Sequence, residues 1–356
     1  MRIAVVGVGL IGGSIGLGAR KRLGAEVSGT DRSPDAVAAA VERGALDHAC
    51  QTTEEALDGA EAAFVAVPVG ALPAVVGDAL AAASDDCVVS DVGSTKRAVV
   101  GAHSDPRFVG GHPLAGTETS GVEHARADLF DDATWYLTPT QSTSGVLYER
   151  LHRVLYGLGA RPAAIDADSH DRILATVSHL PHVMANVLVT RAAEALSSGG
   201  QRLEGTGPSF RDATRVAGAS SAIWTDIYTS NADVLAAELD GFCQQLNEVR
   251  QALSAKDDGW LERWNESAAV DRRRLLEAQL AGEELFELRV SVPNRPGVIA
   301  EIALELGRAG INITDLALYP TPDRREGVVA LWIAGAERAG RTEELIKDLR
   351  LPVVRA

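Results

Sequence analysis

The sequence feature that most constrains the fold is a glycine pattern that directly follows the first apolar run. Residues 2–6 form a β-branched run typical of a buried parallel strand. They lead into Gly7-Val8-Gly9-Leu10-Ile11-Gly12, and a helix is expected from there to about Leu23. A strand, a GxGxxG turn and a helix in this order are typical of a dinucleotide-binding βαβ unit, in which the helix N-terminus faces the phosphates.

An acidic residue follows at the spacing that such a unit requires. The second predicted strand, Glu26–Thr30, leads to Asp31, which lies 19 positions beyond Gly12. A carboxylate there accepts hydrogen bonds from ribose hydroxyls and repels a 2′-phosphate, so NAD is favoured over NADP, although Arg32 could serve a phosphate. The cofactor-binding residues that we predict are Gly7, Gly9, Leu10, Ile11, Gly12, Asp31, Arg32, Val67 and Pro68.

Further buried strands are expected at residues 62–67 and 87–92. The carboxyl ends of parallel strands meet at one edge of a sheet, and the cofactor lies along that edge. Val67 and Pro68 should therefore flank the nicotinamide half of the cofactor, and the turn Gly93–Lys96 should reach the same place. In that turn Ser94 could orient an imidazole or a substrate hydroxyl, and Lys96 could hold an anion or cap its loop.

One imidazole stands between glycines and a proline in the segment Gly110–Glu118. Glycine and proline favour neither helix nor strand, so we predict a shaped loop after the short apolar run 108–109. His112, Thr117 and Glu118 are close enough in this segment to carry proton-transfer chemistry. A solvated surface histidine is the alternative, but convergence with the turns above favours a place for His112 beside the nicotinamide.

From about residue 166 to about residue 281 the pattern is helical. The first of these helices contains Ser178-His179-Leu180-Pro181-His182, in which the two imidazoles are three residues apart and share a face. Pro181 removes a backbone hydrogen bond and should kink this helix. A later helix carries Asp212 and Arg215, which could pair or bind a carboxylate. A helical domain after a dinucleotide-binding domain usually supplies substrate contacts and a dimer interface.

The last part of the chain, residues 284–356, has another order of elements. Strands are expected at 286–292, 311–319, 328–333 and 352–354, with helices ending near residues 309 and 349. The order βαββαβ is ferredoxin-like.

Length and composition limit the partners that the chain can have. Its 356 residues are enough for two or three domains. A net charge of −15 argues against nucleic acid or an anionic membrane. No apolar run reaches membrane-spanning length and Met1-Arg2 leads straight into a strand, so we expect no membrane span and no signal peptide. Three scattered cysteines without CxxC spacing, and no HExxH, indicate a reducing cytoplasm and predict no metal site.

Several of these motifs together resemble those of one family. The motifs are Gly7–Ser14, Asp91–Lys96, Gly111–Glu118, Ser178–His182 and Phe210–Arg215, and the C-terminal part adds Pro293–Gly297 and Gly310–Asn312. Taken in order and spacing, the first five resemble the prephenate/arogenate dehydrogenase family of tyrosine biosynthesis over roughly residues 1–280, and the C-terminal part resembles an ACT regulatory domain. The resemblance implies a Rossmann-type NAD-binding α/β domain (1–165), an all-helical substrate and dimerisation domain (166–281) and a small α+β ferredoxin-like ACT domain (284–356).

The resemblance also implies a reaction and roles for single residues. The chain would be a homodimeric NAD-dependent enzyme that oxidises and decarboxylates prephenate to 4-hydroxyphenylpyruvate. His112, oriented by Ser94, would accept the substrate's hydroxyl proton. The implied substrate-binding residues are Arg215, His179, His182, Thr117, Glu118 and Lys96, and the implied tyrosine-binding regulatory residues are Asn294, Gly297, Gly310 and Asn312.

Three alternatives stay open. Arogenate could be the substrate, which would give tyrosine directly. A dehydrogenase of the 3-hydroxyacid type would lack the SHLPH and FRDATR motifs that this chain contains. A non-catalytic amino-acid sensor with a vestigial nucleotide domain would bind tyrosine without forming NADH.

Overall fold

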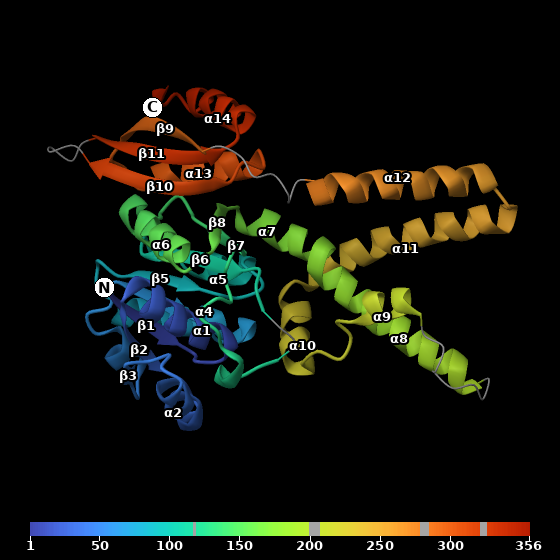
Figure 1. Ribbon diagram of the computed structural model, residues 1–356, viewed down its shortest axis with the longest axis horizontal. Helices are drawn as coiled ribbons and strands as arrows, with labels where there is room; N and C mark the ends of the chain where they lie inside the picture. The colour runs from blue at the N-terminus through green and yellow to red at the C-terminus, as the bar shows by residue number, and fades with distance from the viewer. Residues whose placement is uncertain (117–118, 199–206, 278–284, 321–325) are drawn as a thin grey trace.

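The computed structural model describes residues 1–356 apart from 117–118, 199–206, 278–284 and 321–325. Figure 1 shows an α/β domain at the N-terminus, a long helical arm that extends away from it, and a small C-terminal α+β domain packed on the α/β domain. The three-part fold expected from the sequence is therefore confirmed.

An eight-stranded sheet forms the centre of the first domain. Its strand order is β3-β2-β1-β4-β5-β6-β7-β8. Neighbours pair in parallel except β6 and β7, which are antiparallel. The strands are β1 (Arg2–Val6), β2 (Glu26–Thr30), β3 (His48–Ala49), β4 (Ala62–Val65), β5 (Val88–Asp91), β6 (Phe108–Pro113), β7 (Thr134–Thr138) and β8 (Arg161–Ala164).

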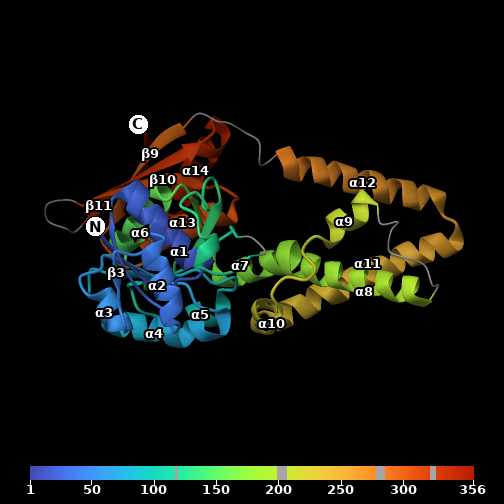
Figure 2. The ribbon, with the colours of Figure 1, turned by 60° about the horizontal axis from the view of Figure 1, so that its bottom comes forward.

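Helices cover both faces of this sheet (Figures 1 and 2). Ser33 begins the second helix as its N-cap, because its side chain accepts a hydrogen bond from the Ala36 N–H and Pro34 occupies the first helical position. The helical segments are α1 (Leu10–Gly18) with a π turn η1 (Ala19–Leu23), α2 (Pro34–Glu42), α3 (Thr53–Leu57), η2 (Val69–Ala71), α4 (Leu72–Ala82), α5 (Arg97–Ala102), η3 (Val122–His124) and α6 (Gly145–Gly157).

The segment around His112 is a strand and not the loop predicted from its glycines. Residues 110–113 pair with β7, and His112 lies opposite Tyr136. Gly110 and Gly111 are needed for close packing here, since a β-carbon at either would overlap Thr138 Oγ1 or the main chain of Asp91. Glycine is usually disfavoured in strands, but the close packing inside this sheet outweighs that tendency here.

The helical arm begins directly after β8. Asp166 caps its first helix by accepting a hydrogen bond from the Ser169 N–H. Figures 1 and 2 show the long helices extending away from the α/β domain. The segments are α7 (Ala167–Leu174), a π turn η4 (Ala175–His179), α8 (Leu180–Ser198), α9 (Pro208–Thr214), α10 (Ser221–Ser230), α11 (Ala232–Ala255) and α12 (Asp258–Glu277).

Where Pro181 predicted a kink, the helix widens into the π turn η4. The wider turn shifts the hydrogen-bond register just before the proline, whose missing N–H would otherwise interrupt the regular pattern. By length and composition the stretch Ala167–Ala195 could span a membrane, although no such stretch was expected. The expectation missed it because its apolar residues are divided into short runs by His170, His179 and His182.

The C-terminal domain has the βαββαβ order expected for it. Its four-stranded sheet has the order β10-β11-β9-β12. Gly297 and Gly310, both with positive φ, lie directly before and shortly after the first helix. The elements are β9 (Leu285–Pro293), α13 (Val298–Arg308), β10 (Ile313–Pro320), β11 (Glu326–Ala334), α14 (Ala336–Asp348) and β12 (Val353–Arg355).

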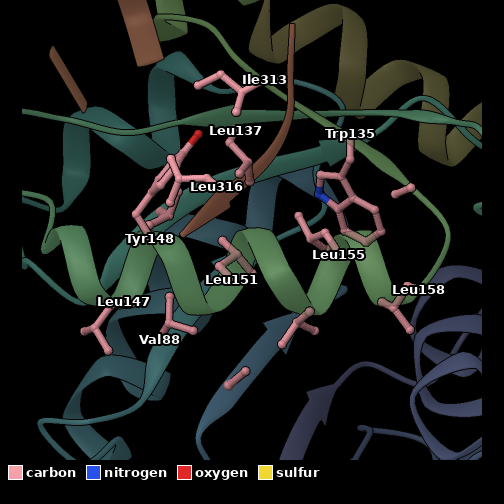
Figure 3. Packing of buried hydrophobic residues seen from close by; sticks show 14 of the residues in the cluster. Val88, Trp135, Leu137, Leu147, Tyr148, Leu151, Leu155, Leu158, Ile313 and Leu316 are labelled. Carbon is pink, nitrogen blue, oxygen red and sulfur yellow. The ribbon is translucent and has the colours of Figure 1, made fainter. Parts of the chain in front are cut away.

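Helix α6 joins the C-terminal domain to the first sheet. Figure 3 shows it with Val88 of β5 on one side, and with Leu137 of β7 and Ile313 and Leu316 of β10 on the other. These side chains belong to one continuous buried cluster. Because the two domains share a hydrophobic core, the ACT-like domain is fixed to the α/β domain of its own chain.

Candidate active site

The glycine loop after β1 leaves room for a phosphate group. A β-carbon at Gly12 would overlap the Gly7 carbonyl oxygen, and one at Gly7 would overlap the Ala66 carbonyl, so both positions require glycine. A β-carbon at Gly9, by contrast, would meet nothing within 4 Å. The N-terminus of α1, where Leu10 and Ile11 form the first turn, has no side-chain cap. This open, positively polarised end fits a pyrophosphate.

Asp31 is held beside that loop by two backbone donors. Its carboxylate accepts hydrogen bonds from the Val8 N–H at 2.9 Å and the Ser33 N–H at 2.9 Å. The adjacent Arg32 is exposed. A carboxylate fixed between the glycine loop and α2 is placed to meet the ribose of a dinucleotide.

The ends of β1, β4, β5 and β6 follow one another along the same edge of the sheet. Val67, two residues beyond β4, lies against Gly7, and Pro68 begins the turn η2. The chain after β6 returns to α1, where Val122 packs on Gly13 and the Arg126 N–H donates to Ser14 Oγ at 3.0 Å. His112 and the glycine loop therefore lie at the same edge of the sheet, and the segment that follows β6 contacts the helix that follows the loop.

The His112 ring is buried, with only 8% of the residue exposed. Its Nδ1 lies 2.9 Å from Nε2 of His170, at hydrogen-bond distance. Burial holds the pKa of His112 well below its usual value, and the nearby ammonium of Lys96 lowers it further. The imidazole is therefore neutral near pH 7, which is the form that accepts a proton.

A hydrogen-bonded chain continues from His112 into α7. Nδ1 of His170 lies 2.7 Å from Asp171 Oδ1, and the same carboxylate accepts from the backbone N–H groups of Lys96 at 2.8 Å and Arg97 at 3.0 Å. Burial alone would raise the pKa of Asp171, but the bonds from His170 and Arg97 keep it below its usual value. Burial also lowers the pKa of His170, against the opposing effect of Asp171.

Lys96 was expected to bind substrate, and its position argues for another role. The residue is fully buried. Its ammonium pairs with Asp91 of β5 and donates to the Gly111 carbonyl of β6 at 2.7 Å. These contacts direct Lys96 into the protein, so we assign it to bracing the turn between β5 and α5 rather than to the substrate.

Ser94 was expected to orient His112, but the partner found for Nδ1 of His112 is His170. The side chain of Ser94 is half-buried in the turn after β5. Thr117 and Glu118 lie outside the described residues. Arg215 lies in the exposed turn that ends α9.

The two histidines of the SHLPH motif are both buried and meet α10. The ring of His182 stacks on Trp224, with centroids 3.6 Å apart, and its Nδ1 is paired with the Tyr228 hydroxyl. His179 meets the edge of Trp224, and its Nδ1 lies 3.3 Å from Nδ2 of Asn231. Since an amide nitrogen can only donate, Nε2 of His179 carries the ring proton and can donate to a ligand. Burial lowers the pKa of His179 to about 4.

Helix α10 is anchored to the α/β domain by polar contacts. The Gly70 N–H donates to Asp226 at 2.8 Å, and Thr95 Oγ1 donates to Ser230 at 3.0 Å. Arg97 forms an ion pair with Asp233 at the start of α11. These contacts fix one side of α10 to the edge of the sheet that carries His112, while Trp224 and Tyr228 on its other side meet the two histidines.

His170, Asp171 and Asn231 belong to the site but were not identified from the sequence. The sequence feature that could have revealed them is the adjacent histidine and aspartate in the first turns of the helix after β8. It lies outside the SHLPH motif, and regular helical spacing gives no reason to connect it with His179.

The expected regulatory residues lie at both ends of α13. Gly297, with φ of +83°, is buried and its N–H donates to the Thr143 carbonyl at 3.1 Å. Asn294 and Gly310 are exposed. Asn312 Oδ1 is buried and has no hydrogen-bond partner in the described part of the chain. The 11 residues of α13 span about 16 Å, so one chain cannot unite both ends in a single amino-acid site.

Family models match all three domains. The model described as prephenate dehydrogenase, nucleotide-binding domain, matches residues 15–163; the prephenate dehydrogenase dimerization domain matches 166–266; and the ACT domain matches 286–350. A prephenate dehydrogenase of Bacillus subtilis (strain 168) is 32% identical, over 97% of this chain and 95% of that protein. The chain belongs to the prephenate dehydrogenase family.

Solved members of this family share the fold over about three quarters of the chain. The A. aeolicus prephenate dehydrogenase, in complex with hydroxyphenyl propionate and NAD+, has a TM-score of 0.72 and 28% identity, covering 77% of this chain and 98% of that one. The Synechocystis arogenate dehydrogenase has a TM-score of 0.68 and 30% identity, covering 77% of this chain and 100% of that one. The family resemblance read from the motifs is confirmed.

The bracing role of Lys96 predicts a loss of stability when the cation is removed. The Lys96→Met variant leaves Asp91 buried without its partner, which should lower the free energy of unfolding by roughly 3–5 kcal/mol. Urea unfolding measures this change. Lys21→Met, at an exposed position, is the control and should change stability by less than about 0.5 kcal/mol. Unchanged stability with a raised KM for substrate would instead identify Lys96 as a substrate ligand.

Proposed function

We propose that this chain is an NAD-dependent prephenate dehydrogenase, which oxidises and decarboxylates prephenate to 4-hydroxyphenylpyruvate in tyrosine biosynthesis. The observation that carries this proposal is the neutral, buried His112 on the sheet edge that also carries the glycine loop. The relatives named above support the substrate class.

The residues of the nucleotide-binding domain fit NAD. Gly7, Gly9 and Gly12, with Leu10 and Ile11 in the first turn of α1, would receive the pyrophosphate, and Asp31 would accept hydrogen bonds from the adenosine ribose. Val67 and Pro68 would flank the nicotinamide, and the exposed Arg32 would lie near the ribose. Bound NAD supplies the hydride acceptor of the reaction.

His112 serves the reaction by holding one proton. The hydride leaves the ring carbon that bears the hydroxyl group, and the hydroxyl proton passes to Nε2 of His112. When carbon dioxide leaves, its bonding electrons enter the ring, and the oxygen takes the proton back to form the phenol. The ring becomes aromatic and no proton is released overall, so a positioned neutral imidazole is sufficient.

The helical domain contributes the polar groups that bind the substrate. We assign Arg215 to a bidentate clamp on a carboxylate, because the guanidinium geometry matches it. His179 and His182 bind the remaining polar groups, with Trp224 stacked beside them. Thr117 and Glu118, after β6, position or gate the site, and Ser94 lies on the same edge to meet the substrate hydroxyl.

A second copy of the chain is the expected partner. The stretch Ala167–Ala195 is long and apolar, and only 33% of its most apolar part is buried within one chain. Exposed Val177, Val187 and Val189 lie along it. Since the dimerization-domain model covers this stretch, its apolar surface is suited to a homodimer. All three cysteines are free, in keeping with a cytoplasmic enzyme.

Tyrosine is the proposed effector of the ACT domain. Asn294 and Gly297 lie at one end of α13 and Gly310 and Asn312 at the other, so the site requires the ends of two paired chains. The buried Asn312 Oδ1 lacks a protein donor in the described residues and suits the ammonium of an amino acid. Gly297 contacts Thr143, so the nucleotide-binding domain can respond to the ligand.

Arogenate is the second candidate substrate, because the Synechocystis relative is an arogenate dehydrogenase. The two substrates differ only at the side-chain keto or amino group. A non-catalytic sensor is the remaining alternative, and it would form no NADH with either substrate.

The reaction is tested by NADH absorbance with purified chain, NAD and either prephenate or arogenate. We expect turnover with prephenate to exceed that with arogenate. In the His112→Asn variant kcat should fall by about 10²–10⁴-fold, while NAD binding, measured by fluorescence titration, should survive. Full turnover in this variant would remove His112 from the mechanism. Absence of NADH with both substrates would refute the dehydrogenase function.

The low pKa of His112 predicts an activity that persists into acid. The active form is neutral and its pKa lies well below the usual value of about 6.5, so protonation removes activity only as pH falls through this lowered pKa. A plot of kcat/KM against pH should therefore stay level from pH 8 to about 6.5 and decline below it. A decline centred at or above about 6.5 would contradict a buried, neutral base.

Removal of the Asn312 amide should weaken inhibition by tyrosine. In Asn312→Ala the ammonium of the effector loses its acceptor, and we expect the half-inhibitory tyrosine concentration to rise about 10-fold. For each variant, inhibition is expressed relative to the rate that the same variant shows without tyrosine. The exposed Asn247→Ala serves as the matched control. Equal inhibition of both variants would place the effector elsewhere.

A further inference from the structure

We propose that Asp171 and His170 are positioning residues that fix His112 in the tautomer with its proton on Nδ1 and its lone pair on Nε2. This inference rests on the proposed function, in which Nε2 of His112 accepts the substrate's proton. The pair lies in α7, on the opposite side of the domain boundary from His112.

The direction of each hydrogen bond between Asp171, His170 and His112 follows from the Asp171 carboxylate, which can only accept. Oδ1 of Asp171 faces Nδ1 of His170 and the Lys96 N–H, and Oδ2 faces the Arg97 N–H, so the carboxylate accepts at every contact. His170 must then carry its proton on Nδ1. In neutral His170, Nε2 can only accept, which requires His112 to donate from Nδ1 at 2.9 Å. Nε2 of His112 is left without a proton.

A charged His170 would reverse this result, because it would donate from both nitrogens and force the proton of His112 onto Nε2. The surroundings oppose that charge. His170 and Asp171 are both fully buried, and the buried ammonium of Lys96 repels a second cation. A neutral His170 is therefore the state that the packing favours.

Further contacts keep the pair rigid. Nδ2 of Asn231 donates to the Asp171 carbonyl at 2.8 Å, and the ring of Tyr136 meets that of His170 nearly at right angles, with centroids 5.6 Å apart. The Asp166 cap fixes the start of α7 four residues before His170. An imidazole held by these contacts has little freedom to rotate away from His112.

The arrangement also stabilises the charge that forms during turnover. As the substrate O–H bond breaks and the Nε2–H bond forms, His112 becomes an imidazolium. Its Nδ1–H remains bonded to His170, whose own proton faces the Asp171 carboxylate. The proton returns to the substrate oxygen when carbon dioxide leaves. His112 is then neutral again, with its proton on Nδ1.

Two substitutions of His170 separate this role from packing. His170→Leu keeps an apolar volume but offers no acceptor to His112, whereas the amide oxygen of His170→Gln can occupy the place of Nε2. We expect kcat to fall about 100-fold in His170→Leu and less than about 10-fold in His170→Gln, with KM for NAD unchanged. His103→Gln, whose ring contacts the Pro73 carbonyl, is the matched control. Equal activity of the Leu variant and the wild type, or a Leu variant more active than the Gln variant, would overturn the proposal.

The tautomer is measured directly in the unmodified protein. Two-bond ¹H–¹⁵N NMR of protein with ¹⁵N-labelled histidine should show a protonated Nδ1 and an unprotonated Nε2 in His112. The His112→Asn variant assigns the signals, because those of His112 are lost in it. A proton on Nε2 would refute the inference even if the enzyme turns over. Conversely, an Nδ1 proton without NADH formation would leave the tautomer in place and refute only the proposed function.

Discussion

A buried cation at the carboxyl end of β5 holds the site together. The Lys96 ammonium bonds to Asp91 of β5 and to the Gly111 carbonyl of β6, and its backbone N–H bonds to Asp171 of α7. One residue thus joins two strands of the nucleotide-binding domain to the first helix of the next domain. Because an unpaired charge cannot remain in this interior, these contacts must form together, and they fix the distance between His112 and His170.

The sequence predicts those parts of the fold that depend on local patterns. The glycine loop, Asp31 and the capped helix at Ser33 are each signalled by a few neighbouring residues, and the structure has them. The strand at residues 110–113 was missed because its glycines are selected by packing against Thr138 and Asp91, which are distant in sequence. Lys96 and Ser94 were assigned from their turn at the predicted sheet edge and from the family resemblance. The buried partners of Lys96, and His170 as the partner of His112 Nδ1, come from segments whose contacts the sequence does not reveal.

The importance of His170 was hidden by helix geometry. Nine residues of regular α-helix turn through about 900°, so His170 and His179 should lie on opposite faces. The π turn at residues 175–179 adds one residue to a turn and brings the second histidine to within roughly 80° of the first. Asn231 can then contact both the Asp171 carbonyl and His179. Single-sequence periodicity cannot supply this shift, because it assumes the regular helix that Pro181 disturbs.

The neutral histidines of the site complement the negative charge of the proposed substrate. Burial keeps His112, His170 and His179 uncharged near pH 7, so these three rings add no positive charge to a chain of net charge −15. Prephenate carries two carboxylates. When it binds, its negative charge favours protonation of a neighbouring imidazole, which raises the basicity of His112 at the step that requires it. A permanently charged histidine would bind the anion more strongly but could accept no proton.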